Sequence, residues 1–253
     1  MSLDRVRDYH ETLDRIERDH WWFASLRDFV VATLIATVPA GARVLDVGCS
    51  TGHVIAAVPD EYERIGADIS SGSIELARAL RPEIRFEEAP VEALPFEDQS
   101  FDCVLALDIL SASGVDDDAA ALREIRRVLR PGGILLVQVA AYEWLRSDYD
   151  ETAGTARRYT RPLVRTLLRA EGFTIEQLTY RITALFPVAA ARRLLPGTGG
   201  AKDLQVPSPT LNRLLAGTTR LENRVARRLR LPFGLSVFGV AVLEEGNGHS
   251  RSA

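Results

Sequence analysis

Hydrophobic and polar positions change their spacing several times along the chain, and each change marks an expected element. From residue 2 to about residue 38, apolar side chains such as Leu3, Val6 and Leu13 recur at helical spacing. Two helical runs are expected there, separated by the aromatic sequence HWWF. The sequence PAG that follows ends this block, because proline and glycine interrupt helices.

Beyond this block, short apolar runs alternate with amphipathic segments. The apolar runs predict strands at 44–47, 64–69, 84–88, 101–107, 134–139, 173–179 and 235–243. The amphipathic segments predict helices at 52–58, 73–80, 115–130 and 160–172. This alternation is typical of an α/β fold with a doubly wound, mostly parallel sheet and helices on both faces.

The pattern divides the chain into five parts. We expect an N-terminal helical cap (1–39), a ligand-binding core (40–184), a helical insertion (185–231), the final strand of the core sheet (232–245) and a disordered tail (246–253). In sheets of this kind, ligands bind beyond the carboxyl ends of the strands. The residues that follow those ends are therefore the first candidates for a site.

Composition and charge narrow the class of protein. The net charge of -4 gives no general reason to expect nucleic-acid binding. The charged start lacks the pattern of a signal peptide, and the longest apolar run, FVVATLIATV, is too short to cross a bilayer. Cys49 and Cys103 have no metal-ligand spacing around them, which favours reduced thiols and no metal site. The sequence therefore predicts a cytoplasmic protein.

The loop after the first expected strand carries the main chemical signal. In VLDVGCSTG, Gly48 and Gly52 let the backbone pass close to a ligand, and Asp46 precedes them. A carboxylate there is a poor neighbour for a pyrophosphate but suits a cationic amino group. Asp68 ends the second strand, about twenty residues further on, where an acid can accept hydrogen bonds from ribose hydroxyls. S-adenosylmethionine has a ribose, a positive charge and no pyrophosphate, and it fits these conditions.

Four motifs together resemble a known family. VLDVGCSTG, GADIS, EALPFEDQSFDCVLALDIL and REIRRVLRPGGILLV resemble class I S-adenosylmethionine-dependent methyltransferases over roughly residues 40–139. Outside this core, HWWF, AYEWLRSDYD, RRYT and LPFGLS resemble a bacterial subgroup of small-molecule methyltransferases. The resemblance implies a Rossmann-like methyltransferase fold with an antiparallel last strand, S-adenosyl-L-methionine as cofactor and a small-molecule substrate.

Cofactor-binding residues are implied at the ends of several strands and in the N-terminal cap. They are Asp46, Gly48, Ser50 and Gly52 around the methionine moiety, Asp68 at the ribose, Ile69 and the backbone N–H of Val91 at adenine, Leu107 beside the amine and methyl group, and Arg27 at the cofactor carboxylate. Members of the family usually have an aspartate where this chain has Pro90, so that side-chain contact to adenine is missing from the pattern.

Catalysis requires a base only if the nucleophile must lose a proton, as a hydroxyl does. The candidates are Asp108, His20, Asp148 and Tyr149. Related proteins often have histidines where this chain has Tyr149 and Thr155. Aromatic side chains can stabilise a sulfonium by cation–π contact, and the candidates for such walls are Trp21, Trp22, Tyr142 and Trp144.

The predicted insertion contains an amphipathic and locally basic segment at 212–230. Leu214, Leu221 and Val225 are expected on one face of a helix, and arginines on the other. We expect this helix to pack on the domain with its charged side in water. A peripheral contact with anionic lipid, a homodimer face and a cap over the substrate pocket are the alternatives.

The sequence thus predicts S-adenosylmethionine-dependent methylation, with O-methylation favoured, of a natural-product intermediate, a sugar or a lipid-linked glycan. One alternative keeps the fold and uses the bound cofactor for a cyclisation. Another is a non-catalytic partner subunit. A nicotinamide dehydrogenase is disfavoured, because Asp46 precedes Gly48 where a pyrophosphate would lie.

Overall fold

The computed structural model describes residues 12–147, 150–151, 153–194 and 206–244. Seven strands form one sheet in the order β3-β2-β1-β4-β5-β7-β6. The strands are β1 (Arg43–Val47), β2 (Glu63–Asp68), β3 (Arg85–Glu88), β4 (Phe101–Leu107), β5 (Leu129–Ala140), β6 (Phe173–Arg181) and β7 (Ser236–Leu243). All neighbours pair in parallel except β7, which runs antiparallel to β5 and β6. The predicted fold class, with its antiparallel last strand, is confirmed.

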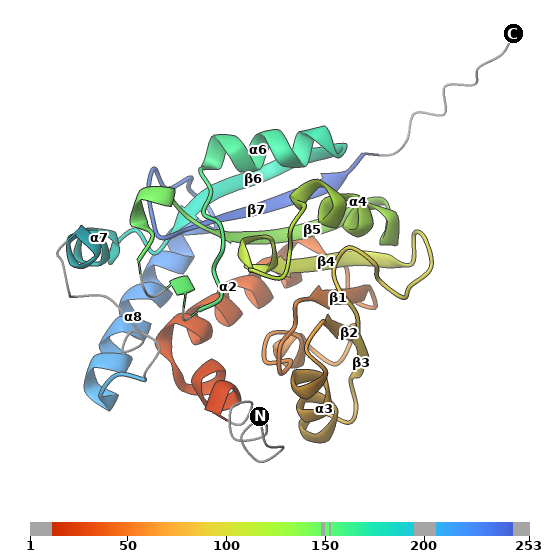
Figure 1. The fold of residues 1–253 in the computed structure, drawn as a ribbon, viewed down its shortest axis with the longest axis horizontal. Coiled ribbons are helices and arrows are strands. Elements are labelled where there is room, and N and C mark those ends of the chain that lie inside the picture. The colour runs from red at the N-terminus through yellow and green to blue at the C-terminus, as the bar shows by residue number, and fades with distance from the viewer. Residues whose placement is uncertain (1–11, 148–149, 152, 195–205, 245–253) are drawn as a thin grey trace, which may run out of the picture.

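Helices cover both faces of this sheet (Figure 1). One face carries α4 (Asp118–Val128) and α6 (Arg161–Ala170), and the other carries α2 (Trp21–Thr37), α3 (Ser71–Leu80) and α8 (Pro209–Ala226). Residues 12–19 are also helical, and α7 (Phe186–Leu194) follows β6. Three short 3₁₀ turns are η1 (Ile55–Ala57), η2 (Ile109–Ser111) and η3 (Glu143–Leu145).

The helices are held to the sheet by apolar faces that the sequence pattern predicts. In α4, Leu122 and Ile125 are fully buried against one face of the sheet. In α2, Phe29 is buried on the other face, and its ring meets the ring of Phe238 edge-on with 4.8 Å between centroids. Helix α2 is therefore packed directly against the sheet, with Phe29 on strand β7.

The strand order brings the predicted ligand-binding ends together. β1 pairs with β2 on one side and with β4 on the other, all in parallel. The carboxyl ends of these three strands therefore lie side by side at one edge, at Val47, Asp68 and Leu107. The loop after β1 lies between the other two ends, which is the arrangement expected of a ligand site in a doubly wound sheet.

Two predicted helices differ from the structure. The helix expected at 52–58 is wrong, since only η1 forms there. Gly52 has φ +85°, and Pro59 follows directly, so the window between them is too short to nucleate an α-helix. The helix expected at 115–130 begins later and ends earlier, because Asp117 caps its N-terminus and Leu129 already pairs with Phe101.

The orientation of α8 also differs from the prediction. Its buried side chains are Thr219, Asn223 and Ala226, whereas Leu214 and Leu221 are exposed. The polar and small residues, not the leucines, face the domain.

Other expectations concern single residues and the chain ends. Cys49 and Cys103 are buried and unpaired, as expected. Asp148, Tyr149 and the predicted tail at 246–253 lie outside the described residues. None of the helices in the described ranges is long and apolar enough to span a bilayer.

Candidate functional site

The loop after β1 uses left-handed backbone at three positions. Gly48 has φ +74°, Ser50 has φ +51° and Gly52 has φ +85°. A Cβ on Gly48 would lie 2.8 Å from the Ile109 side chain, and one on Gly52 would lie 2.7 Å from Phe86. Both glycines are therefore required by conformation and by space. Ser50 adopts the same region despite its side chain, which is uncommon for a residue other than glycine, asparagine or aspartate.

Asp46 lies beneath this loop and is 2% exposed. Burial raises the pKa of this carboxyl well above its usual value, and the nearby Asp68 and Glu17 carboxylates raise it further. Ionisation of Asp46 therefore lowers the stability of the ligand-free folded protein. A cationic group placed close to it would relieve that cost.

Asp68 holds the loop from the neighbouring strand. Its Oδ2 accepts a hydrogen bond from the Ser50 backbone N–H, and its Oδ1 accepts one from the Ser70 N–H, each at 2.8 Å. A carboxylate oxygen can accept more than one hydrogen bond, so these contacts leave capacity for hydroxyl donors. The next residue, Ile69, is 59% exposed, so an apolar surface for an adenine ring is available beside it.

Asp108 follows β4 in left-handed conformation, with φ +59°. Its Oδ2 accepts a hydrogen bond of 2.8 Å from Nε2 of Gln138 on β5. Burial raises the pKa of Asp108, while the Gln138 hydrogen bond and the Arg181 charge lower it. The strained backbone and the amide together fix the direction of this carboxylate.

Gln138 links Asp108 to a buried arginine. Arg181, at the end of β6, is 1% exposed and donates from Nη1 to Oε1 of Gln138. Its Nη2 donates to the Ser25 carbonyl and to Oδ1 of Asn223, each at 3.2 Å, and its guanidinium lies 4.4 Å from the centre of the Phe29 ring. Burial lowers the pKa of Arg181 to about 10. This chain of contacts, here called the Arg181 relay, places a buried cation behind Asp108.

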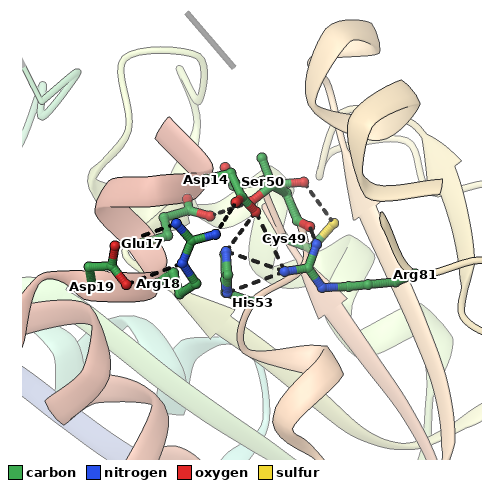
Figure 2. Close-up of polar contacts among 9 residues, drawn as sticks. Asp14, Glu17, Arg18, Asp19, Cys49, Ser50, His53 and Arg81 are labelled. Carbon is green, nitrogen blue, oxygen red and sulfur yellow. Dashed lines mark hydrogen bonds and ion pairs between the residues drawn. The ribbon is translucent and has the colours of Figure 1, made fainter. Parts of the chain in front are cut away.

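The N-terminal helical segment closes over the glycine loop through charged contacts (Figure 2). Oδ1 of Asp14 lies 2.8 Å from Nε2 of His53 and 3.6 Å from Nη2 of Arg81. Arg81 also donates to the Thr51 carbonyl at 2.7 Å. The hydroxyl of Thr51 donates to Oε2 of Glu17 at 2.6 Å. We call these five residues the N-terminal latch.

Two groups of the latch have altered acidity. Burial raises the pKa of Glu17, although the Thr51 hydrogen bond opposes this change. Burial and the neighbouring Arg81 lower the pKa of His53. The histidine is thereby held neutral, while the glutamate adds a further carboxylate to the site.

The loop, the latch and the end of β4 enclose one cavity of about 120 Å³. Six of the residues predicted from the sequence line it: Arg27, Asp46, Gly48, Ser50, Leu107 and Asp108. Glu17 also lines the cavity, so three carboxylates face it together with one arginine. The cavity is smaller than the roughly 300 Å³ or more of typical ligand sites. A ligand of the size of S-adenosylmethionine would therefore have to extend beyond it, toward Asp68 and the exposed Ile69.

The remaining predicted residues lie elsewhere. His20 accepts from the Trp22 N–H through Nδ1 and so caps α2; it is not among the residues that line the cavity. Val91 is buried in the turn after β3. Gly52 lies close to the Phe86 ring and lets the loop pack against it.

The aromatic side chains proposed as walls form a separate group. Tyr142 stacks on Tyr180 with 5.1 Å between ring centroids, and Phe186 meets Tyr142 at 5.7 Å. Trp21 and Trp22 pack against the same group. The aromatic residue that lines the cavity is Phe23 of the HWWF sequence.

The latch and the Arg181 relay have no signal in the sequence pattern. Glu17 lies in a helix that is charged throughout, and Arg181 is the last residue of an ordinary strand, so neither has a local motif. Their partners, Thr51 and Gln138, are distant in sequence. Only the folded chain brings these pairs together.

Comparisons with known proteins find similarity to methyltransferases. Residues 45–137 match a family model described as "Methyltransferase domain". The chain is 40% identical to the ubiquinone/menaquinone biosynthesis C-methyltransferase UbiE of Hahella chejuensis, over 40% of this chain and 43% of that protein. It is 32% identical to the O-methyltransferase cnsE of Penicillium expansum, over 55% of this chain and 54% of that protein.

A solved structure extends the similarity over more of the chain. The [4+2]-cyclase SpnF superimposes with a TM-score of 0.59 and 26% sequence identity, covering 87% of this chain and 80% of that one. The chain spans about half the length of the curated relatives it matches. The matched segment includes the glycine loop, Asp68 and Asp108. Residues 45–137 are therefore similar to a methyltransferase domain.

Proposed function

We propose that this protein methylates a small molecule with S-adenosylmethionine as the methyl donor. The observation that carries the proposal is the cavity at the ends of β1 and β4, where Glu17, Asp46 and Asp108 meet beside the glycine loop. Buried carboxylates without equal positive charge favour a cationic ligand. The donor supplies, when bound, a methyl group activated by a positively charged sulfur.

The residues present fit such a cofactor. Gly48 lines the cavity and has no side chain, so a ligand can approach its backbone closely. Asp46 and Glu17 offer negative charge to an ammonium group, and Arg27 offers a cation to a carboxylate. Asp68 lies at the mouth of the loop with hydrogen-bond capacity for ribose hydroxyls. The protein's main contribution is to orient the reactants and exclude water, which can supply roughly 7–11 kcal/mol of the barrier.

Asp108 is the candidate general base of this proposal. It lines the cavity, and burial raises its pKa toward the range in which a carboxylate removes protons effectively. The Arg181 relay orients the carboxylate through Gln138. A base at this position favours an acceptor that must lose a proton, and we therefore propose O-methylation. The two named relatives act, by their names, as a C-methyltransferase and an O-methyltransferase.

The substrate class of the proposal is a natural-product intermediate, a sugar or a lipid-linked glycan, modified in the cytoplasm.

A second candidate function is a cyclisation that uses the bound cofactor without methyl transfer. The similarity to the [4+2]-cyclase SpnF supports this second candidate function. Product analysis separates the two, because methylation releases one S-adenosylhomocysteine for each product and cyclisation releases none.

Calorimetry of cofactor binding tests the site directly. The unaltered chain is expected to bind S-adenosylmethionine, and Asp68→Ala to bind it about ten- to a hundredfold more weakly, because an ionic hydrogen-bond acceptor is lost. Asp98→Ala removes a carboxylate that is 73% exposed and far from the loop in sequence, and should change nothing. A folded chain without affinity for S-adenosylmethionine would contradict the proposed function.

A further inference from the structure

Helix α8 presents a row of apolar side chains to solvent. Leu214, Leu221 and Val225 are spaced by seven and four residues, so they share one face of the helix. Leu214 is 65% exposed, Leu221 is 63% exposed and Val225 is 40% exposed. Leu229, just beyond the helix, is 62% exposed. We call these four residues the α8 stripe.

The outward orientation of the stripe is fixed by polar contacts on the opposite side of the helix. Asn212 accepts from the Trp21 N–H at 2.9 Å and donates to the Asp19 carbonyl at 2.8 Å. Asn223 donates to the Ser25 carbonyl at 2.9 Å and accepts from Arg181. Rotating the leucines inward would break these bonds and leave Arg181 short of an acceptor.

A third contact holds the same orientation. Glu222 is the only acidic residue of α8. Its two carboxylate oxygens accept hydrogen bonds from the Thr183 and Ala184 N–H groups, at 2.9 and 2.8 Å. The single negative charge of the helix is thereby directed to the backbone before α7, away from the stripe.

Arginines lie along one side of the stripe. With about 3.6 residues per turn, Arg213, Arg220 and Arg224 lie beside the leucines on the solvent side. All are exposed, and so are the arginines at 227, 228 and 230 that follow the helix. Arg220 pairs with Asp28 at 3.2 Å across an exposed surface. The stripe and these arginines together form a surface that is apolar at its centre and basic at its edge.

This local charge is opposite to that of the chain. Residues 209–230 contain six arginines and one acidic residue, whereas the whole chain has a net charge of -4. The rest of the protein is therefore clearly acidic and would be repelled by an anionic surface. A segregated basic region of this kind orients the molecule, so that α8 faces an anionic partner first.

We propose that α8 binds the surface of an anionic lipid bilayer, with the stripe inserted among the acyl chains and the arginines at the headgroups. An exposed amphipathic helix with arginines beside leucines has the chemistry of an interfacial membrane anchor. A second copy of the chain is a poorer occupant, because a two-fold interface through this face would bring two arginine clusters together. Nucleic acid would engage the arginines but leave the stripe exposed to water.

The position of α8 also connects this surface to the site. α8 packs beside α2 (Figure 1), and Asn212 bonds to the two residues that flank His20, between the latch helix and α2. A bilayer bound at the stripe would thus be separated from the segment that covers the cavity by the width of α8. The proposal does not depend on the reaction, since binding to lipid is measured without substrate.

Vesicle sedimentation with the full chain tests this proposal. The unaltered protein is expected to sediment with phosphatidylcholine vesicles that contain phosphatidylglycerol, to remain in solution with phosphatidylcholine alone, and to dissociate as salt is raised. Leu214→Gln/Leu221→Gln should weaken binding by roughly tenfold or more, because the apolar insertion is lost. Arg224→Gln/Arg228→Gln should weaken it by a similar factor through the loss of two charges.

A matched control lies on α6, which also has an exposed leucine beside arginines. Leu163→Gln/Arg169→Gln should sediment like the unaltered chain. Cofactor affinity and circular dichroism, unchanged in all three variants, show that they remain folded. The proposal is overturned if the unaltered chain fails to sediment with anionic vesicles, or if the α6 variant loses as much binding as the α8 variants. It is also overturned if Leu214→Gln/Leu221→Gln abolishes a dimer, or if RNA binds through the arginines while anionic vesicles do not.

Discussion

The side-chain amide of Gln138 donates a hydrogen bond of 2.8 Å to Asp108, and in doing so it joins a carboxylate at the cavity to a cation in the core. The cation is Arg181, which donates to the carbonyl oxygen of the same amide. Among the described residues, its Nε has no hydrogen-bond partner. The guanidinium therefore depends strongly on the few acceptors that it has, and Gln138 is one of them.

Gln138→Leu should destabilise the protein by roughly 3 kcal/mol, because it leaves a buried cation and a carboxylate without their shared partner. The free energy of unfolding in urea measures this effect. The double variant Gln138→Leu/Arg181→Met removes both polar groups, and should cost less than the sum of the two single variants. Additive losses within about 0.5 kcal/mol would show that the two side chains do not act together.

Asp46→Asn should stabilise the ligand-free protein while weakening cofactor binding. Burial raises the pKa of Asp46, so the folded chain holds this proton more tightly than the unfolded chain does. The charged form therefore costs stability at neutral pH, and this cost disappears as pH falls through the raised pKa toward the unfolded value of about 3.9. Asparagine resembles the neutral acid. The variant should be more stable by the order of 1 kcal/mol at pH 7, with the difference shrinking toward pH 4.

Thermal or urea unfolding at several pH values checks this prediction, with calorimetry for the loss of S-adenosylmethionine affinity. Asp60→Asn is the matched control, since its side chain is 91% exposed. That control should stay within about 0.5 kcal/mol of the unaltered chain at every pH. The prediction is contradicted if the stability difference between Asp46→Asn and the unaltered chain grows as pH falls. That result would mean that ionisation of Asp46 costs the folded chain little stability.

The sequence pattern was sufficient for the sheet, because most strands bury a run of apolar residues and most connections between strands contain proline or glycine. It also predicted Asp46, Asp68 and Asp108 as site residues, since each lies within one residue of the carboxyl end of a strand. The helix predicted after Gly52 failed, because periodicity over seven residues does not show that the window is too short to nucleate a helix.

The sequence pattern also did not predict the orientation of α8. Apolar periodicity marks Leu214 and Leu221 as the buried face, and it assumes that burial of leucine decides which side packs. In the folded chain, Asn212 and Asn223 bond to the backbone of the N-terminal region instead. Such contacts depend on where α2 lies, and the N-terminal latch depends in the same way on long-range placement.

Thr51→Val should loosen the N-terminal latch. The hydroxyl of Thr51 donates to Glu17 at 2.6 Å, and valine keeps the shape but removes the donor. A hydrogen bond to a charged acceptor contributes about 1.5–3 kcal/mol, so local opening should increase roughly ten- to a hundredfold. Hydrogen exchange of the backbone amides at 12–19 measures the opening, and bound cofactor should dissociate faster.

Thr37→Val is the matched control for the latch, because Thr37 lies at the exposed end of α2 and its hydroxyl bonds only within that helix. Its exchange rates at 12–19 should equal those of the unaltered chain. Equal exchange in Thr51→Val and Thr37→Val would show that the N-terminal segment is held by other contacts.

Gly52→Ala should destabilise the protein and disturb the cofactor loop. Gly52 has φ +85°, and the Cβ of the alanine would lie 2.7 Å from the ring of Phe86, which is buried. Left-handed backbone and overpacking each cost about 1–3 kcal/mol, so a loss of roughly 2 kcal/mol or more is expected in urea unfolding. Gly217→Ala in α8 is the opposite case, since nothing lies within 4 Å of its Cβ. Alanine there should be neutral or stabilise by about 0.5–1 kcal/mol, and a similar loss at both positions would show that the loop imposes no special demand.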